Sequence, residues 1–130
     1  AFLNVKLKYI QNDIEGRKKV ANYYLENIKN SVIILPIVNN KEGHVWHLFV
    51  IRTENRSRLQ DYLENNGVQT IIHYPIPVHH QQAYIEYSKL SLPITESIHN
   101  QVLSLPLSPV SSVIELDQIV NLLNKYKVNE

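Results

Sequence analysis

The sequence contains no cysteine and no methionine, and it has only three glycines among its 130 residues. Without cysteine the chain forms neither disulfides nor thiolate metal sites, and this composition agrees with a cytoplasmic location. Gly16, Gly43 and Gly67 stand too far apart to build a glycine-rich phosphate-binding loop. No apolar run approaches the roughly 18 residues that a helix needs to cross a bilayer, so no membrane partner is expected.

The sequence also lacks an excess of charge of either sign, because 13 basic and 12 acidic residues leave a net charge of only +1. This balance argues against nucleic acid as a partner, since nucleic-acid binding draws on an excess of Lys and Arg. The sequence also lacks a Gly-x-Ser-x-Gly nucleophile motif. Its lysines sit in polar or amphipathic surroundings, unlike the enclosed lysine of a Schiff-base enzyme.

The sequence opens with a long helical pattern. Residues 1–30 carry apolar side chains at alternating spacings of three and four, the period of one helix face. Gly16 weakens the middle of this helix by about 1 kcal/mol relative to alanine, so we expect a bend between residues 12 and 16. No capping residue precedes the helix, and we expect the chain to be a piece of a longer protein. The face consists of Leu3, Leu7, Ile10, Ile14, Arg17, Ala21, Tyr24 and Ile28, and Arg17 is its one polar interruption.

Residues 31–130 predict an α+β body. The order of its elements indicates a two-layer small domain, in which a small, mostly antiparallel sheet is covered by helices and entered by the long N-terminal helix. The expected strands are residues 32–38 and 44–52, joined as a hairpin with Trp46 in the core, and residues 68–74 and 102–106. The expected helices are one capped at residues 53–55 and stopped at 65–67, a helical turn within 81–89, a short helix from Thr95 to about Gln101, and a last helix opened by a capping box at Ser112 and Glu115.

Six histidines raise the question of a metal site. His44 and His47 lie an odd number of positions apart on an expected strand, so they face opposite sides and do not bind one ion together. A site formed by His73, His79 and His80 is not favoured either, because the sequence places no carboxylate nearby to orient the ligands. We therefore expect no metal.

The densest polar cluster spans residues 73–84, directly after an expected strand. His73 and Tyr74 follow two apolar residues, and loops fed by strand ends are common places for binding sites. Pro75 and Pro77 stiffen the loop, which lowers the cost of ordering it around a ligand. Such a loop suits a hydroxyl-rich or phosphate-bearing ligand. The alternative is a proline-rigidified turn with ordinary surface histidines.

Five motifs, in matching order and spacing, resemble the small domain of the DegT/StrS-type sugar aminotransferases. The resemblance covers nearly the whole chain, including residues 6–9 and Arg17 of the long helix. The motifs are HVWHLFVIR at residues 44–52, RLxxYLxxxGVxT at 58–70, HYPxPxHxQxAY at 73–84, LPxTE at 92–96 and LSLP at 103–106.

This resemblance implies a pyridoxal-phosphate enzyme of the aspartate aminotransferase fold. Residues 1–130 would be its C-terminal small domain, and residues 1–30 the connecting helix. In the family, a large N-terminal domain holds the coenzyme and the Schiff-base lysine, and the enzyme works as a homodimer with sites near the subunit interface. It transfers an amino group, usually from glutamate, to a keto group on a nucleotide-linked sugar. The isolated chain is therefore expected to be inactive and to hold no coenzyme.

The resemblance also implies roles for single residues. His73 and Tyr74 match the family loop that reaches the active site from the small domain, which makes them candidate substrate contacts rather than catalytic bases. Pro75 and Pro77 would shape that loop, and His79 matches a recurrent position without an assigned role.

Two other hypotheses stay open from the residues themselves. The chain could be a free-standing α+β module that binds a small ligand, or regulates a partner, through the loop at residues 73–84. The apolar stripe between Leu3 and Ile28 could instead serve dimerisation. The length of the parent reading frame would separate the free-standing module from the enzyme domain.

Overall fold

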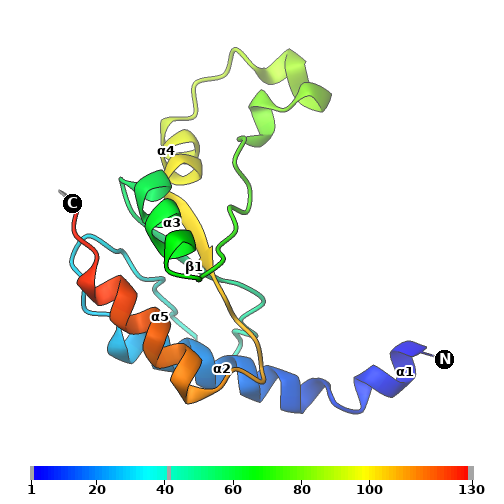
Figure 1. Ribbon diagram of the computed structural model, residues 1–130. Coiled ribbons are helices and arrows are strands. Elements are labelled where there is room, and N and C mark those ends of the chain that lie inside the picture. Colours follow the sequence, from blue (N-terminus) through cyan, green and yellow to red (C-terminus); the bar gives the residue numbers. More distant parts are fainter. Residues whose placement is uncertain (1, 41, 129–130) are drawn as a thin grey trace.

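The computed structural model describes residues 2–40 and 42–128, and it has the expected α+β architecture of a two-stranded antiparallel sheet with helices (Figure 1). None of the helices in these two ranges is long and apolar enough to cross a membrane. The elements in chain order are α1 (Phe2–Leu7), α2 (Ile10–Asn27), β1 (Phe49–Arg52), α3 (Arg56–Asn65), the 3₁₀ helices η1 (Val78–His80) and η2 (Gln82–Tyr87), α4 (Pro93–Gln101), β2 (Val102–Leu105) and α5 (Val113–Lys125).

The sheet joins two segments that are far apart in the sequence. Strand β1 pairs antiparallel with β2, with Phe49 opposite Leu105 and Arg52 opposite Val102. The predicted hairpin is therefore wrong, because residues 32–38 contribute only a single bridge from Ile34 to Arg52. Pro36 lacks an N–H group and cannot extend that bridge into a ladder.

The strand expected at residues 44–52 is shorter than predicted. Trp46 has a φ of 51°, in the left-handed region, so the extended backbone begins only at Phe49. Trp46 is nevertheless a core residue as expected, with 4% of its surface exposed and its ring stacked on Phe49 at a centroid distance of 5.3 Å.

Residues 68–74 do not form the predicted strand. They contribute one bridge, from Ile71 to Ser104. Their first backbone groups are already engaged by α3, since the Val68 N–H donates to the Leu63 carbonyl at 2.8 Å and the Gln60 amide donates to the carbonyl of Thr70 at 3.4 Å. Few groups are left for a continuous ladder.

The N-terminal region forms two helices rather than one. The break is a turn at Lys8 and Tyr9, not the bend expected between residues 12 and 16. Gly16 lies inside α2, where a Cβ atom would come within 2.7 Å of Pro109. Its lack of a side chain therefore allows close packing of the helix against the loop that follows β2.

The core lies between the sheet and helices α2, α3 and α5, and α2 packs against α5 (Figure 1). Only the second half of the predicted apolar face enters it, since Leu3 and Leu7 are 75% and 60% exposed. The Tyr24 hydroxyl donates to the Pro106 carbonyl at 2.8 Å, which fixes α2 to the end of β2. The fully buried apolar side chains are Ala21, Tyr24, Phe49, Ile51, Leu59, Leu63, Leu103 and Leu123.

Two helix ends lie where the neighbouring residues in the sequence predict them. Gly67 follows Asn66, the C-cap residue of α3, and has a φ of 79°, as its predicted stop requires. The predicted capping box of α5 is present, with the Ser112 N–H donating to Glu115 at 2.7 Å and the Glu115 N–H donating to the Ser112 hydroxyl at 3.3 Å. Helix α4 begins at Pro93 instead of after Thr95, because proline suits the first helical position, where an N–H has no partner.

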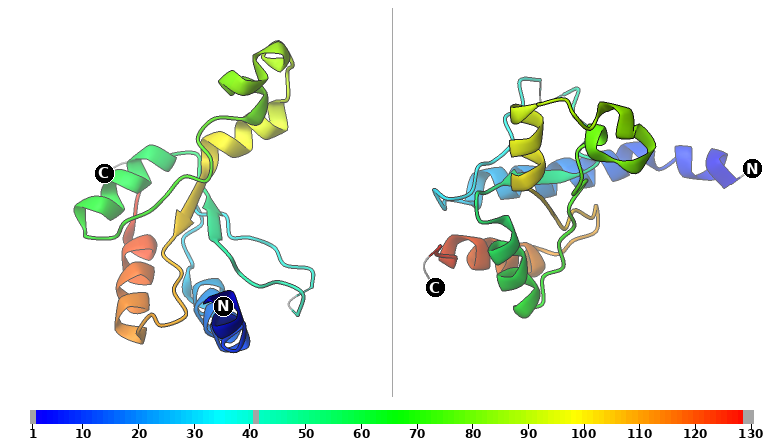
Figure 2. Two further views of the ribbon diagram at one scale, coloured as in Figure 1. Left: turned by 90° about the vertical axis from the view of Figure 1, so that its right-hand side faces the viewer. Right: turned by 90° about the horizontal axis from the view of Figure 1, so that it is seen from above.

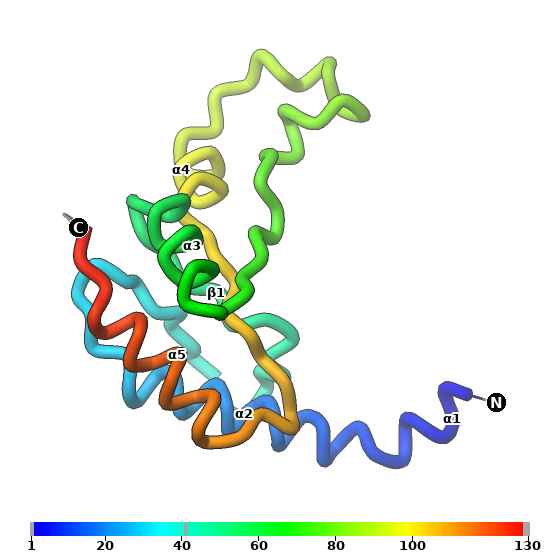
Figure 3. The backbone as a smooth tube through the Cα atoms, in the orientation of Figure 1, coloured from blue at the N-terminus to red at the C-terminus, as the bar shows by residue number. Residues whose placement is uncertain are grey.

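Residues 74–92 form an arm that projects from the body (Figures 2 and 3). It contains η1 and η2, and η2 confirms the helical turn expected within residues 81–89. Helix α4 leads from the arm back into β2, so the arm and the sheet are connected through one helix.

Candidate functional site

His73 and Tyr74 lie where the arm leaves the body. His73 is half-buried, and its ring Nδ1 lies 2.9 Å from the hydroxyl Oγ of Ser104. Ser104 is a buried residue of β2, and its backbone also forms both hydrogen bonds of the bridge to Ile71, at 2.8 and 3.2 Å. The sheet thus holds the backbone just before His73 and, through the same serine, the imidazole ring.

A hydrogen bond holds the backbone of Tyr74, whereas its ring is accessible to solvent. Its carbonyl accepts a hydrogen bond of 2.7 Å from Nδ1 of His99 in α4, so His99 carries its proton on that nitrogen. Arg56 donates to the His99 carbonyl and extends the connection to α3. The Tyr74 side chain is 68% exposed, and its ring meets the His73 ring edge-on at a centroid distance of 5.7 Å.

A small cavity of about 170 Å³ opens beside His73. Its polar side chains include His47, His73 and Ser104, while Leu105 and Leu107 supply part of its apolar wall. Binding pockets for drug-sized ligands usually measure at least about 300 Å³, so this cavity accommodates only part of such a ligand. Its donors and acceptors, two imidazoles, a hydroxyl and the amide of Gln69, suit a hydroxyl-bearing group.

The sequence did not identify His47 or Ser104 as members of this site. His47 was considered only as a metal ligand together with His44. In the structure it lines the cavity beside His73, a residue 26 positions later in the chain. Ser104 had a detectable signal, since it is the one polar residue in the buried strand VLSL. A buried hydroxyl needs a hydrogen-bond partner, which indicates a specific contact.

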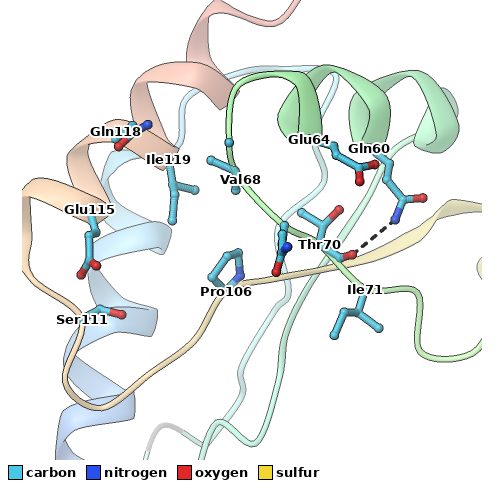
Figure 4. Close-up of a pocket in the computed structure, with 12 residues that line it drawn as sticks. Gln60, Glu64, Val68, Thr70, Ile71, Pro106, Ser111, Glu115, Gln118 and Ile119 are labelled. Atoms are coloured by element: carbon cyan, nitrogen blue, oxygen red, sulfur yellow. Dashed lines mark hydrogen bonds between the residues drawn. The ribbon is translucent and has the colours of Figure 1, made fainter.

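A larger groove of about 910 Å³ lies between α3, α5 and residues 68–71 (Figure 4). The charged residues that line it are Glu64 and Glu115, both acidic, so the groove disfavours a phosphate-bearing ligand. Neither His73 nor Tyr74 lines it. This groove therefore lacks the residues that the sequence predicts for the site, although it shares Gln69, Ile71 and Pro106 with the cavity beside His73.

His79 has a defined structural contact. It is buried, and its Nε2 lies 3.3 Å from the carboxylate of Glu96 in α4, so it fastens the arm to that helix. The Leu92 N–H also donates to this carboxylate, at 2.8 Å. That hydrogen bond, together with the smaller effect of His79, holds the pKa of Glu96 below its usual value against the opposing effect of desolvation.

The two prolines expected to shape the loop stand before η1. Pro77 immediately precedes this 3₁₀ helix, and its carbonyl accepts the His80 N–H at 2.9 Å. Pro75 precedes Ile76, whose carbonyl accepts a 3.2 Å hydrogen bond from the Gln81 side chain. The arm is therefore folded around these prolines by local hydrogen bonds.

A model of the DegT/DnrJ/EryC1/StrS aminotransferase family matches residues 1–124. The chain belongs to this family, as the sequence motifs indicated.

Two of the curated relatives are named as sugar transaminases. The dTDP-3-amino-3,6-dideoxy-alpha-D-galactopyranose transaminase of Aneurinibacillus thermoaerophilus is 49% identical over 126 residues, which are 97% of this chain and 35% of the relative. The dTDP-3-amino-3,4,6-trideoxy-alpha-D-glucose transaminase of Streptomyces venezuelae is 38% identical over 112 residues, covering 84% of this chain and 30% of the relative. The chain thus spans about a third of the length of these relatives.

Solved structures show the same fold. DesV of S. venezuelae, in complex with a ketimine intermediate, superimposes with a TM-score of 0.88 at 33% identity, over 95% of this chain and 34% of DesV. A DegT/DnrJ/EryC1/StrS aminotransferase from Brucella abortus gives a TM-score of 0.84 at 32% identity, over 93% of this chain and 33% of that enzyme.

The described lysines do not fit a coenzyme site of their own. Each is exposed except Lys18, which is half-buried and donates to the Glu42 carbonyl at 3.0 Å. A lysine that forms a Schiff base sits in a pocket that desolvates its amine. Pyridoxal phosphate, on which the family's chemistry depends, would need residues other than the described lysines to hold it.

Proposed function

We propose that this chain is the C-terminal small domain of a pyridoxal-phosphate-dependent aminotransferase that acts on a nucleotide-linked keto sugar, with glutamate as amino donor. The observation that carries the proposal is the match of 97% of the chain to a dTDP-amino-sugar transaminase of which it spans 35%. The remaining two-thirds of such an enzyme would hold the coenzyme, which supplies the electron sink for amino transfer.

In this proposal the small domain contributes contacts on the sugar side. His73 offers a ring nitrogen whose orientation is set by Ser104, and Tyr74 offers an exposed phenol beside it. Both groups exchange hydrogen bonds with hydroxyls of a sugar. Because the adjoining cavity measures about 170 Å³, other parts of the enzyme would complete the site.

The exposed apolar side chains support two partners for this domain, the large N-terminal domain and the second subunit of a homodimer. Apolar patches exposed on a domain commonly mark surfaces that another part of a protein covers. Helix α1 exposes Phe2 and Leu3, which are 82% and 75% accessible, and the arm exposes Ile85, which is 64% accessible.

Amino transfer tests the proposal directly. The chain, joined to the upstream sequence of its own gene, is incubated with pyridoxal phosphate, dTDP-3-amino-3,6-dideoxy-alpha-D-galactopyranose and 2-oxoglutarate, and glutamate is measured. Glutamate formation is the expected result. Its absence with this sugar and with the other amino sugars named for the relatives would contradict the proposal.

A second experiment tests the part assigned to this chain alone. The 130-residue chain is mixed with pyridoxal phosphate, reduced with borohydride and examined by absorbance. We expect no stoichiometric adduct, because the described lysines are exposed or half-buried. A stoichiometric adduct on one lysine would show that this chain carries the coenzyme attachment site.

A further inference from the structure

Three side chains that are common metal ligands meet where the arm touches α4. They are His79 and His80 of η1 and Glu96 of α4, and one ligand atom of each lies within 4.8 Å of the others. The two imidazole rings are 4.0 Å apart between centroids. The sequence alone does not favour a metal site here, because no carboxylate stands near these histidines in the chain. The fold brings Glu96, which lies 16 positions after His80, next to both of them.

The spacing of two ligands already matches that of a zinc site. Zn–N and Zn–O bonds of about 2.0–2.2 Å in a tetrahedron place neighbouring ligand atoms roughly 3.4 Å apart. Nε2 of His79 and Oε1 of Glu96 are separated by 3.3 Å. His80 is exposed, so rotation of its side chain brings its ring nitrogen inward at little cost.

The backbone around these ligands holds them in position. The Leu92 N–H fixes the carboxylate of Glu96 by donating to Oε1 at 2.8 Å. His79 is 6% exposed and is therefore confined by its surroundings, while the 2.9 Å hydrogen bond from the His80 N–H to Pro77 closes the 3₁₀ turn that carries both histidines. Because His79 and Glu96 are held in place before an ion arrives, only the His80 side chain has to be ordered when it binds.

The donor types decide which ions fit. Two imidazoles and one carboxylate suit Zn²⁺ and neighbouring transition metals, whereas Mg²⁺ and Ca²⁺ prefer oxygen ligands throughout. With three protein ligands, a tetrahedral ion keeps one position for water or for a group from another chain.

We propose that His79, His80 and Glu96 form a binding site for a divalent transition-metal ion, of which Zn²⁺ is the best match. The ion replaces the direct contact between His79 and Glu96 and joins the arm to α4 through three ligands. The site is separate from His73 and Tyr74, and it does not depend on the enzymatic role proposed above.

Titration calorimetry with ZnCl₂ on the full chain tests this proposal. We expect one saturable site, and His80→Ala should weaken it by about tenfold or more, since even the loss of an outer-shell partner costs 10–100-fold. His80 is exposed and is not a partner in the hydrogen bond between His79 and Glu96, so this variant should keep its circular dichroism spectrum. Glu96→Gln should weaken binding similarly.

The matched control is His47→Ala, which removes an exposed histidine at a different place. It should bind Zn²⁺ like the unchanged chain, and Mg²⁺ should give no binding heat. Co²⁺ provides a geometric readout, because a four-coordinate ion gives strong visible absorption that His80→Ala should abolish. The proposal is overturned if no saturable Zn²⁺ site is found, or if His47→Ala weakens binding as much as His80→Ala does.

Discussion

The hydroxyl Oγ of Ser104 lies 2.9 Å from the ring Nδ1 of His73, so a residue of the sheet orients a side chain at the base of the arm. Ser104 also pairs through its backbone with Ile71. One serine therefore fixes both the main chain that leads to His73 and the direction of its imidazole.

Replacing Ser104 with alanine should show whether its hydroxyl orients the His73 ring or only stabilises the fold. The backbone bridge to Ile71 remains, so we expect the free energy of unfolding to fall by only about 1 kcal/mol, the net value of one hydrogen bond. In the complete enzyme of the proposed function, the KM for the sugar should rise several-fold because the His73 ring is no longer held. The half-reaction with glutamate should keep its rate.

Ser57→Ala, at an exposed position of α3, is the control for Ser104→Ala. It should change neither the free energy of unfolding nor the KM for the sugar. An unchanged KM for the sugar in Ser104→Ala, alongside the expected loss of stability, would mean that the hydrogen bond serves the fold alone.

Gly16→Ala should destabilise the protein, although alanine is the better helix former. The new Cβ would come within 2.7 Å of the Cβ and carbonyl oxygen of Pro109, and neither belongs to a flexible side chain. Overpacking of this kind costs about 1–3 kcal/mol, which over most of this range exceeds the roughly 1 kcal/mol that alanine gains over glycine in a helix. Urea denaturation measures the result.

Asn22→Ala is the matched variant, at an exposed position of the same helix. It should raise the free energy of unfolding by a few tenths of a kcal/mol, as helix propensity alone predicts. Stabilisation by Gly16→Ala of the same size would contradict the close contact with Pro109.

Ser112→Ala should lower the free energy of unfolding by about 1 kcal/mol, because it removes the side chain that caps α5. The adjacent Ser111→Ala provides the comparison, since the capping hydrogen bonds to Glu115 come from Ser112. Thermal and urea denaturation of both variants measure the difference. Equal losses in the two variants would indicate that the cap contributes nothing specific.

Acid should weaken the same helix end through Glu115. The Ser112 N–H and, to a smaller extent, its hydroxyl donate to the carboxylate and lower the pKa of Glu115 from its ordinary value of 4.5. The stabilisation is therefore complete above that ordinary value and is lost as the pH falls through the lower pKa of the folded state.

Glu115→Gln tests this pH dependence, because an amide does not ionise. The unfolding free energies of the variant and the unchanged protein should differ at neutral pH and converge in acid. Ser112→Ala keeps the N–H hydrogen bond and loses only the hydroxyl, so its pH dependence should be intermediate. A gap that stays constant down to the acid limit would contradict the role of the ionised carboxylate.

The parts of the fold that the sequence predicted well depend on neighbouring residues. The stop at Gly67, the capping box of α5 and the buried strand β2 each follow from signals within a few positions. The hairpin failed because β1 pairs with a segment about 50 residues later, and no local signal reports that choice. The left-handed backbone at Trp46, whose ring packs on Phe49, likewise has no signal in the neighbouring residues.

The candidate site likewise combines residues that the sequence predicted with contacts that it could not predict. The sequence found His73 and Tyr74 because they form part of a recognisable motif. It could not find the contact of His73 with Ser104, or the approach of Glu96 to His79, because the partners lie 31 and 17 positions apart in the chain. Sequence motifs therefore identified the groups, and tertiary structure supplied their partners.

The direct passage from α4 into β2 gives the arm a mechanical link to the sheet. Gln101 ends the helix and Val102 begins the strand without an intervening loop. The arm is fastened to this helix at both His79 and Tyr74, whose partners are Glu96 and His99. The strand that orients the His73 imidazole through Ser104 is therefore continuous in the chain with the helix that holds the arm.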